Sequence, residues 1–499
     1  MQPSIAPRRF WLGSTALNVR GLWLLGSFRI ASATLGLALL ASAQGASAQV
    51  QAPLPTGGVF VAGQGVISQP SDTSLAIRQG SARGVIDWRA FSIAAGHSVT
   101  IDNGNGATLN RVLGGQISQI DGQLSSTGSV YLMNPHGVIV GAGGRVIAGG
   151  DFVASTRQMD MDAFLSGGPL PVSGSTAGGI VNRGSIVSKS GSVVMIARSI
   201  ENHGTIEAAN GRATLATADD VLLASTNDND GGLYVSTGTG GGDITQGGRI
   251  RAAAVSLQAA GGNIYTLAGN RDGLIQATGS STIDGQLWLT APKGGIIVQG
   301  GLASTRVDGD GGQIGINGRE VVLASGAVLD ARGAAGGEIL IGVSSYGEGR
   351  DLADKTVISD GVSILAGGPG GPGRIETSGL KVEIGAATIL PGAGGEWLLD
   401  PTDLVIDAAA ASTMVASLDA GSNVVQETAS GSGGAGDITV AAPIIWTGAG
   451  DLTLNAFRNL DINAAISGGA WFTFSAGGDV VVAAPVTASV IQTGLPALA

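Results

Sequence analysis

Few residues in this 499-residue chain have the types and spacing that catalysis requires. Cleavage of a glycosidic bond needs two carboxylates held near each other, and the adjacent acidic pair outside the glycine-rich loops is Asp219-Asp220. Proton transfer near neutral pH would fall to histidine, and the three histidines are His97, His136 and His203. None of them has an acid–base set beside it in the sequence. The residues therefore predict no catalytic centre.

Two short acidic segments could supply the oxygen ligands that calcium prefers. They are Asp228-Asn229-Asp230-Gly231 and Asp308-Gly309-Asp310-Gly311. Neither continues into a calcium-binding loop that ends in glutamate, and neither repeats as a nonapeptide array. The chain has no cysteine, so a cysteine–histidine metal cluster is excluded. We expect flexible polar loops at both segments, with no metal site and no cofactor.

The composition favours a stack of short strands over conventional globular cores. Glycine accounts for 86 residues, charged residues make up 13% of the chain and aromatic residues 4%, whereas 43% is hydrophobic. No Gly-X-Y period indicates collagen, and a weakly charged apolar chain is not typical of disorder. Small apolar residues with frequent glycine suit strands that stack on copies of themselves. Such a protein obtains its core by stacking and needs no disulfide bonds.

The stretch of residues 116–156 shows this organisation most clearly. Short β runs at Ser129–Met133, Val138–Val140 and Arg145–Ile147 are separated by turn residues. The first corner between them is Asn134-Pro135-His136-Gly137. Asparagine can bond its own backbone two residues on, proline presets φ, and glycine closes a turn where a Cβ would crowd. We interpret the histidine as a solvated turn residue.

Internal repeats predict the fold class. Asn182–Ile186 recurs twenty residues later as Asn202–Ile206, and Gly311–Ile314 recurs twenty-five residues later as Gly336–Ile339. Periods of this length with three short strands each indicate an all-β, right-handed parallel β-helix, a solenoid with short extra-helical loops. Each coil is unstable alone and is stabilised by its neighbours. The best helix candidate is the alanine-rich Ala408–Ser417.

Residues 1–48 have the pattern of an extended signal peptide. A leader with four arginines and no acid precedes an apolar run from Ile30 to Ala43, and Ala46-Ser47-Ala48 supplies a cleavage site. Removing the four arginines takes the net charge from −11 to −15. An acidic chain repels phosphate backbones, so no nucleic-acid partner is expected. No later apolar run is long enough to span a membrane. We expect an exported, soluble protein that enters the periplasm through the Sec translocon.

The Asn-Pro-His-Gly region resembles the secretion domain of filamentous haemagglutinins and related two-partner-secretion exoproteins. The family pattern reads roughly S-x-I/L-x-G-x-L-x-S-x-G-x-V-x-L-x-N-P-N-G-I, and the resemblance covers about Gly58 to Leu223. The high-molecular-weight adhesin branch is closest, because a second motif of many such domains, Asn-Pro-Asn-Leu, is absent. His136 stands for Asn and Val138 for Ile, which preserves turn and strand chemistry. The matching residues are Ser118, Ile120, Gly122, Leu124, Ser126, Gly128, Val130, Leu132, Asn134, Pro135, Gly137 and Val138.

The resemblance implies an N-terminal cap and a dedicated partner. The segment I-D-W-x-x-F-x-I contains Trp88 and Phe91 and is similar to a family pattern of the cap, with ordinary core packing as the alternative. In the family, an outer-membrane β-barrel transporter with periplasmic recognition domains recognises the N-terminal domain. We expect Asn134-Pro135-His136-Gly137 to be a secretion motif that fixes a turn for folding or recognition. A plain corner without partner contact is the alternative.

These patterns together predict four segments and a function. The segments are a signal peptide at 1–48, a secretion domain at 49–300, β-helical repeats at 301–395 and a C-terminal β-repeat segment at 396–499. The predicted protein is a non-enzymatic exoprotein, secreted or surface-bound on a Gram-negative bacterium, that adheres to cells or surfaces through an unknown receptor. A polysaccharide-active β-helix enzyme is one alternative. A truncated delivery rod of a contact-dependent toxin is the other, and it would need a C-terminal effector that this chain does not show.

Overall fold

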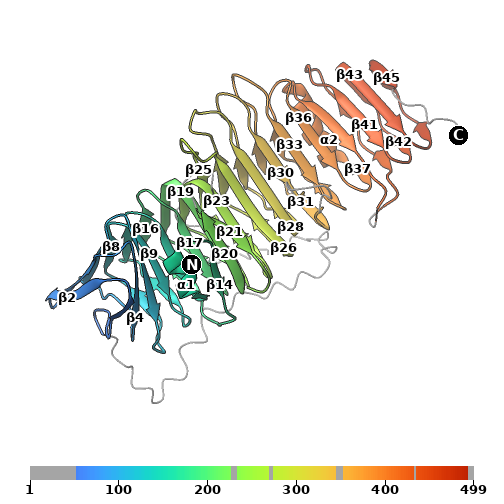
Figure 1. The fold of residues 1–499 in the computed structure, drawn as a ribbon. Helices are drawn as coiled ribbons and strands as arrows, with labels where there is room; N and C mark the ends of the chain where they lie inside the picture. The colour runs from blue at the N-terminus through green and yellow to red at the C-terminus, as the bar shows by residue number, and fades with distance from the viewer. Residues whose placement is uncertain (1–51, 226–232, 269–272, 344–351, 432–433, 493–499) are drawn as a thin grey trace, which may run out of the picture. The chain divides into compact units, whose positions relative to one another are not determined.

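The computed structural model describes residues 52–225, 233–268, 273–343, 352–431 and 434–492. The predicted signal peptide and the acidic segment at 228–231 lie outside these residues. From Gln51 onward the chain forms one compact unit. Its strands wind into a parallel β-helix with three short strands per coil, and successive coils follow one another along the stack (Figure 1). This confirms the all-β solenoid that the repeats predict.

Three faces run along the stack, and each strand pairs in parallel with the strands on the same face of the neighbouring coils. Face A consists of β7 Ser118–Ile120, β10 Val138–Val140, β15 Ile180–Asn182, β18 Ile200–Asn202, β22 Ile244–Gln246, β24 Ile264–Thr266, the ends of β26 Gln286–Val298 and β28 Gln313–Leu323, β31 Lys355–Ile358 and β34 Val382–Ile384. A separate parallel sheet of β37 Leu404–Ile406, β39 Ile438–Val440, β42 Leu460–Ile462 and β44 Val480–Val482 follows it in the chain.

Face B continues the coil after the corner that ends face A. It consists of β3 Ser74–Gln79, β5 Ser98–Asp102, β8 Gln123–Ser126, β11 Arg145–Ala148, β16 Ser185–Ser188, the starts of β19 Thr205–Thr217 and β23 Arg249–Ala259, β25 Ile275–Ala277, β27 Gly301–Ser304, β29 Val328–Asp330, β32 Ser363–Leu365 and β35 Thr388–Leu390. Further along the chain, the same position is taken by β40 Ile444–Ile445 and the starts of β43 Ile466–Ala476 and β45 Val486–Gln492.

Face C completes each coil and carries the outer structures. It consists of β4 Arg83–Trp88, β6 Ala107–Val112, β9 Ser129–Met133, β12 Phe152–Ser155, β17 Val193–Ala197, the remaining parts of β19, β23, β26, β28, β43 and β45, and β30 Glu338–Ile341, β33 Arg374–Ser378, β36 Glu396–Asp400, β38 Asn423–Glu427 and β41 Leu452–Ala456. At its N-terminal end, β1 Val59–Ala62 pairs antiparallel with β4, and β2 Gly65–Ser71 pairs antiparallel with β3.

The core consists of apolar side chains stacked in register, and at some positions the same residue recurs from coil to coil. On face A, Ile180, Ile200, Ile244 and Ile264 occupy one position of four successive coils, and each is at most 1% exposed. Burying one such side chain contributes roughly 1.5–3 kcal/mol relative to leaving it exposed. A coil removed from the stack would expose both of its flanks, so stability comes from neighbouring coils.

Corners between strands are held by side-chain oxygens that accept backbone N–H groups of the next coil. Asp243 Oδ1 accepts the Asn263 N–H at 2.8 Å, and Asn263 Oδ1 accepts the Gly295 N–H at 2.7 Å. Asp403 Oδ1 accepts three successive N–H groups, at 2.8–2.9 Å. Buried N–H groups need such partners where the strand ladder stops. The acidic residues are therefore part of the corner structure.

The Asn182 repeat forms a buried amide ladder at another corner. Asn182 Nδ2 donates to Asn202 Oδ1 at 2.8 Å, and Asn202 Nδ2 donates to Gln246 Oε1 at 2.8 Å. Gln246 Nε2 ends the ladder on the Gly248 carbonyl at 2.8 Å. All three side chains are fully buried. The sequence repeat thus reflects hydrogen bonding between coils as well as apolar stacking.

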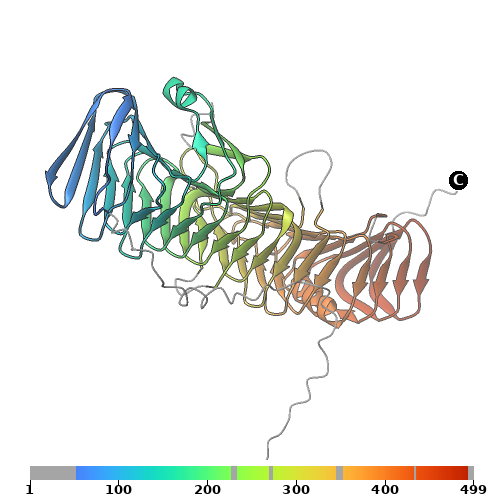
Figure 2. The ribbon, with the colours of Figure 1, turned by 90° about the horizontal axis from the view of Figure 1, so that it is seen from below.

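A four-stranded antiparallel sheet lies outside the coils, on the outer side of face C. It contains β13 Gln158–Met159, β14 Leu170–Ser173, β20 Asp220–Ser225 and β21 Leu233–Thr237, and α1 Met161–Ser166 connects its first two strands. Figure 2 shows these elements standing off the coil stack. They cover a second apolar core, where Tyr131 meets Phe164 edge-on at 5.3 Å between ring centroids. Burial raises the pKa of Tyr131. This sheet and α1 are larger than the short loops that the sequence predicts.

Helix α2 Ala408–Asp419 confirms the helix predicted at Ala408–Ser417 and contacts both β35 and β40 of face B. Its Thr413 hydroxyl donates to the Gly385 carbonyl at 2.9 Å and accepts the Ala387 N–H at 3.0 Å. Ser417 Oγ donates to the Ile389 carbonyl at 2.6 Å. Side-chain hydroxyls of α2 therefore supply hydrogen-bond partners to backbone groups at and just before β35, where no parallel strand in the described part of the chain pairs with β35 on this side.

Strand β36 pairs with β33 and β38, so face C continues past residue 396. The segment boundaries at residues 300 and 395 stay predictions. Among the described residues, no helix has the length and apolarity needed to cross a membrane.

Acidification is expected to weaken the C-terminal corners. Hydrogen bonds from the Thr447 and Gly448 N–H groups lower the pKa of Asp419. A depressed carboxyl pKa contributes stability above the unfolded value of about 3.9, and this stability is lost as pH falls through the lower folded value. Asp419→Asn keeps an oxygen acceptor but removes the charge. Urea unfolding should therefore show wild type more stable than the variant at pH 7 and a smaller difference at pH 3.

Asp461→Asn is the matched control for this measurement. Asp461 lies on face-A-like strand β42 and makes no hydrogen bond through its side chain to another described residue. Its substitution should leave the pH dependence of unfolding as in wild type. An Asp419→Asn protein that differs from wild type equally at both pH values would contradict the corner role of the carboxylate.

Candidate functional site

The Asn134-Pro135-His136-Gly137 turn connects β9 on face C to β10 on face A. The Gly137 N–H donates to the Asn134 carbonyl at 3.1 Å, and Asn134 Oδ1 accepts the His136 N–H at 3.0 Å. Gly137 has φ of 127°, a conformation that residues with a Cβ rarely adopt. The turn therefore has the hydrogen bond from asparagine and the closing glycine that the sequence indicates.

Asn134 also ties this turn to the preceding coil. Its Nδ2 donates to the Gln116 carbonyl at 2.9 Å and to Ser118 Oγ at 3.0 Å. The Asn134 side chain is fully buried, whereas His136 is exposed and Pro135 is half-buried. The asparagine can act on a partner of the folded domain only through the shape of the turn, and the histidine is the most exposed member of the motif.

Trp88 and Phe91 lie in the core near the N-terminal end of the stack. Their rings meet edge-on at 5.3 Å between centroids, and each residue is 1% exposed. Trp88 Nε1 donates to Asn110 Oδ1 at 3.0 Å, so the indole is both packed and hydrogen-bonded. Strand β1 pairs beside Trp88's own strand β4. Their assignment to a cap stays a prediction.

The remaining predicted chemical residues do not converge on one site. His97 Nδ1 contacts its local Ala95 carbonyl at 3.1 Å, and His203 Nε2 lies 3.3 Å from Glu201 Oε2. In the 308–311 loop, Asp308 Oδ1 accepts the Asp310 N–H at 3.0 Å, which is ordinary turn bonding. Across the described parts of the chain, no group of three or more His, Asp or Glu residues is placed to hold a metal ion.

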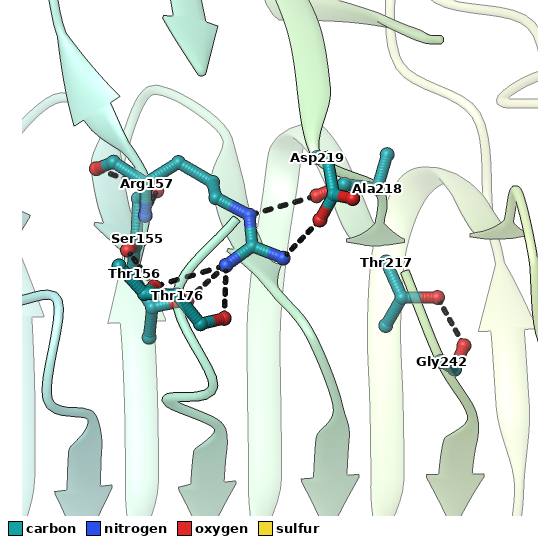
Figure 3. Close-up of polar contacts among 8 residues, drawn as sticks. All are labelled: Ser155, Thr156, Arg157, Thr176, Thr217, Ala218, Asp219 and Gly242. Carbon is teal, nitrogen blue, oxygen red and sulfur yellow. Dashed lines mark hydrogen bonds and ion pairs between the residues drawn. The ribbon is translucent and has the colours of Figure 1, made fainter. Parts of the chain in front are cut away.

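Asp219 and Asp220 are not a paired acid–base set. Asp220 begins strand β20 of the extra-helical sheet, whereas Asp219 Oδ1 accepts a hydrogen bond from Arg157 Nη2 at 2.8 Å. Arg157 belongs to the Thr-Arg step that follows β12. Asp219 thus forms a structural ion pair with Arg157 at the base of the extra-helical sheet (Figure 3).

Two segments leave the coils to build the extra-helical sheet: the first, with β13, α1 and β14, follows β12, and the second, with β20 and β21, follows β19. Arg157 connects these two excursions of the chain. Its Nη1 donates to the Thr176 carbonyl at 2.7 Å, where the first excursion ends, and its Nε donates to the Ala218 carbonyl at 2.9 Å, where the second begins. Thr217 Oγ1 donates to the Gly242 carbonyl at 2.6 Å and closes the second excursion (Figure 3).

The electrostatics of Arg157 identify it as a structural anchor. The side chain is 0% exposed, and burial lowers its pKa while the charge of Asp219 opposes that shift. A buried guanidinium is tolerated when carbonyl and carboxylate acceptors surround it. Nothing in the sequence singles out this arginine, because its carboxylate partner lies 62 positions away.

The fold and the turn together define the secretion domain of a two-partner-secretion exoprotein. The family model of the TPS secretion domain matches residues 52–304, which is half of the chain, so this protein belongs to that family. Family members are secreted from Gram-negative bacteria across the outer membrane through a transporter partner. The resemblance noted from the Asn-Pro-His-Gly region is confirmed.

Known relatives cover parts of the chain. Two heme/hemopexin-binding proteins of Haemophilus influenzae are 33% and 34% identical to it over 128 residues, which is 25% of this chain but only 14% of each relative. The crystal structure of the HMW1 secretion domain from Haemophilus influenzae matches with a TM-score of 0.56 at 23% identity. That match covers 84% of this chain and 100% of the other, and it shows a shared fold.

Arg157→Met is expected to loosen the extra-helical sheet more than the coils. The variant leaves the Thr176 and Ala218 carbonyls and Asp219 without their donor, a loss of roughly 3 kcal/mol. Hydrogen exchange monitored by mass spectrometry should show faster exchange in β13, β14, β20 and β21 than in wild type, with face A unchanged.

The control is Arg319→Met, which removes an exposed ion pair with Asp354. Exposed pairs contribute little to stability, so this variant should exchange like wild type. If the extra-helical strands of Arg157→Met keep wild-type protection, Arg157 does not anchor the sheet.

Proposed function

We propose that this protein is an adhesive exoprotein whose N-terminal domain is recognised in the periplasm by a dedicated outer-membrane β-barrel. The observation that carries the proposal is the secretion-domain match over residues 52–304, which includes the Asn134 turn. The signal peptide delivers the chain through the Sec translocon, and the barrel's periplasmic recognition domains then bind the N-terminal domain. The chain crosses the outer membrane extended and folds outside.

The structure is physically suited to this route. The chain has no cysteine, so no disulfide crosslink would block passage through a narrow pore. Strand pairing joins each coil to its neighbours, and a solenoid of this kind folds by adding one coil to the next. Folding outside the membrane makes backward movement unfavourable and so biases transport outward.

In this proposal the secretion motif acts through turn geometry. Buried Asn134 and left-handed Gly137 fix the turn, and exposed His136 lies where a partner can touch it. Pro135 restricts the second turn position. The two possible roles of the motif depend on different residues. A role through turn geometry requires Asn134, whereas a role through direct contact with the barrel requires the exposed His136 side chain.

Secretion of three variants separates these roles. With the partner barrel co-expressed, wild type should reach the medium, and Asn134→Ala should accumulate in the periplasm because its turn and the Ser118 hydroxyl lose their partner. Asn202→Ala, which removes a buried amide of the Asn182 ladder outside the motif, should be secreted. His136→Ala should lower secretion only if the barrel touches that side chain.

Immunoblots of medium and periplasm measure secretion. Urea unfolding of Asn134→Ala and Asn202→Ala tests whether the two variants lose similar amounts of stability. Each substitution should cost about 1–3 kcal/mol. Escape of wild type without any barrel, or equal retention of Asn134→Ala and Asn202→Ala, would refute a secretion role specific to the motif.

The adhesive role rests on resemblance to the high-molecular-weight adhesin branch and on the β-helical coils beyond residue 304. The binding named for the two Haemophilus relatives belongs to proteins of which this chain matches only 14%, so that activity is not assigned here. We further propose that the protein is not an enzyme. The placement of Asp219 in an ion pair supports this, because the pair cannot serve as free acid and base.

Purified protein coated on beads should increase bead attachment to epithelial cells relative to uncoated beads, and soluble protein should compete. Incubation with soluble pectin and other glycans should release no reducing sugar. If coated beads attach no better than uncoated beads, the adhesive role is refuted. If the protein releases reducing sugar, the alternative of a polysaccharide-active enzyme is supported.

A further inference from the structure

A hollow of about 330 Å³ opens on the outer side of face C, beside the last strand of the extra-helical sheet. Its floor is formed by β23, β26 and β28, and β19 and β21 border it. Its volume lies at the lower end of the range for small-molecule sites, roughly 300–1,000 Å³. The hollow takes no part in the Asn134 turn or the Arg157 anchor.

Strand register explains why face C is hollowed here. Ser256 pairs with Trp288, and Trp288 pairs with Gly315 on the next coil. A Cβ at Gly315 would lie 1.7 Å from Trp288 Cζ3, so the indole rests directly on the glycine backbone. The small side chains of Ala254 and Ser256 leave space beside the indole. Trp288 thus forms an aromatic part of the floor.

Tyr234 of β21 is the second aromatic residue that lines the hollow. It is 43% exposed, and the Arg212 guanidinium carbon lies 4.0 Å from its ring centroid. Arg212 Nη2 also donates a hydrogen bond to the Tyr234 hydroxyl. Tyr234 and Trp288 both line the hollow, from β21 and β26 respectively. The hollow therefore presents two amphipathic aromatic rings to a ligand.

Polar groups suited to hydroxyl recognition line the gap. The side chains of Gln286, Thr290 and Asn317 form no hydrogen bond to any other residue that the structure describes. Gln258 Nε2 donates to the Val235 carbonyl at 3.2 Å and to Ser256 Oγ at 3.0 Å, which leaves its Oε1 as an acceptor. Amides and hydroxyls both donate and accept, as the vicinal hydroxyl groups of a sugar require.

The charge of the hollow differs from that of the whole protein. The chain has a net charge of −11, yet the residues that line the hollow include Arg212 and no aspartate or glutamate. Arginine recognises carboxylates through parallel hydrogen bonds. A ligand with a carboxylate is therefore favoured over a neutral one.

We propose that this hollow binds a saccharide unit, with an acidic sugar preferred, by contact with Tyr234 and Trp288 and hydrogen bonds to the surrounding amides. The apolar C–H face of the sugar lies against the aromatic rings, and its carboxylate faces Arg212. The site deepens the adhesive role proposed above, on which its biological purpose rests, by assigning a ligand class and a location.

The test uses the purified full-length mature chain on an array of neutral and acidic glycans. Titration calorimetry then compares methyl β-glucuronide with methyl β-glucoside, which differ only in the carboxylate. Wild type should bind acidic glycans and prefer the glucuronide. Trp288→Ala should weaken binding by roughly tenfold or more, and Arg212→Gln should abolish the preference for the acid.

Trp471→Ala is the matched control, because Trp471 lies on face C of β43 and is 50% exposed but is remote from the hollow in sequence and strand order. It should bind like wild type. Ser256→Phe fills the hollow without removing Trp288 and should also abolish binding, which guards against a fold defect in Trp288→Ala. Circular dichroism checks each variant.

Absence of binding to every glycan, or equal loss in Trp288→Ala and Trp471→Ala, would overturn the saccharide site. Bead attachment to cells separates this result from the adhesive proposal. Adhesion that persists in Trp288→Ala and Ser256→Phe refutes the role of the hollow and leaves adhesion standing. Glycan binding without adhesion refutes the adhesive role and leaves the site standing.

Discussion

The constraint on which this structure depends is the satisfaction of backbone N–H groups at the corners of each coil. Strand ladders satisfy the flat faces, but a corner leaves donors that need another acceptor. Here side-chain oxygens of one coil accept N–H groups of the next, as Asp243, Asn263 and Asp403 do. These three acidic and amide side chains therefore have a structural role at corners.

The Asn134 turn differs from the corner at Asp243 in the direction of its side-chain hydrogen bonds. The Asp243 side chain bonds to Asn263 of the following coil, so this contact forms only after that coil has folded. The side chain of Asn134 bonds instead to its own turn and back to Gln116 and Ser118. Its network is complete before any later coil exists. For a chain that folds coil by coil, this makes the turn a stable edge on which the next coil can be added.

The sequence predicts structural features that have a local or regularly repeating pattern. It does not predict contacts between residues that are far apart in the chain. The 20-residue Asn182 repeat predicts coil stacking, and the Ala408–Ser417 composition predicts α2, because both signals are local. The extra-helical sheet pairs strands 50 residues apart and is held by Arg157, whose partner Asp219 lies 62 positions away. No local pattern marks that arginine. Asp219 shows the same limit, because the sequence shows only its acidic neighbour Asp220 and not the ion pair that Asp219 forms with Arg157.

Face C is where this solenoid can acquire function, and the reason is geometric. The interior of the coils is filled by stacked apolar side chains, so a ligand can be received only on an outer surface. Outward positions of face C first support the second apolar core under the extra-helical sheet and then, one coil later, the small residues around Trp288. The end of the covering sheet thus supplies the wall that turns a flat strand surface into a hollow. Arg157 bonds to Ala218 and Asp219 directly before β20, and β20 pairs with β21, the strand that carries Tyr234, so the anchor and the hollow share one outer structure.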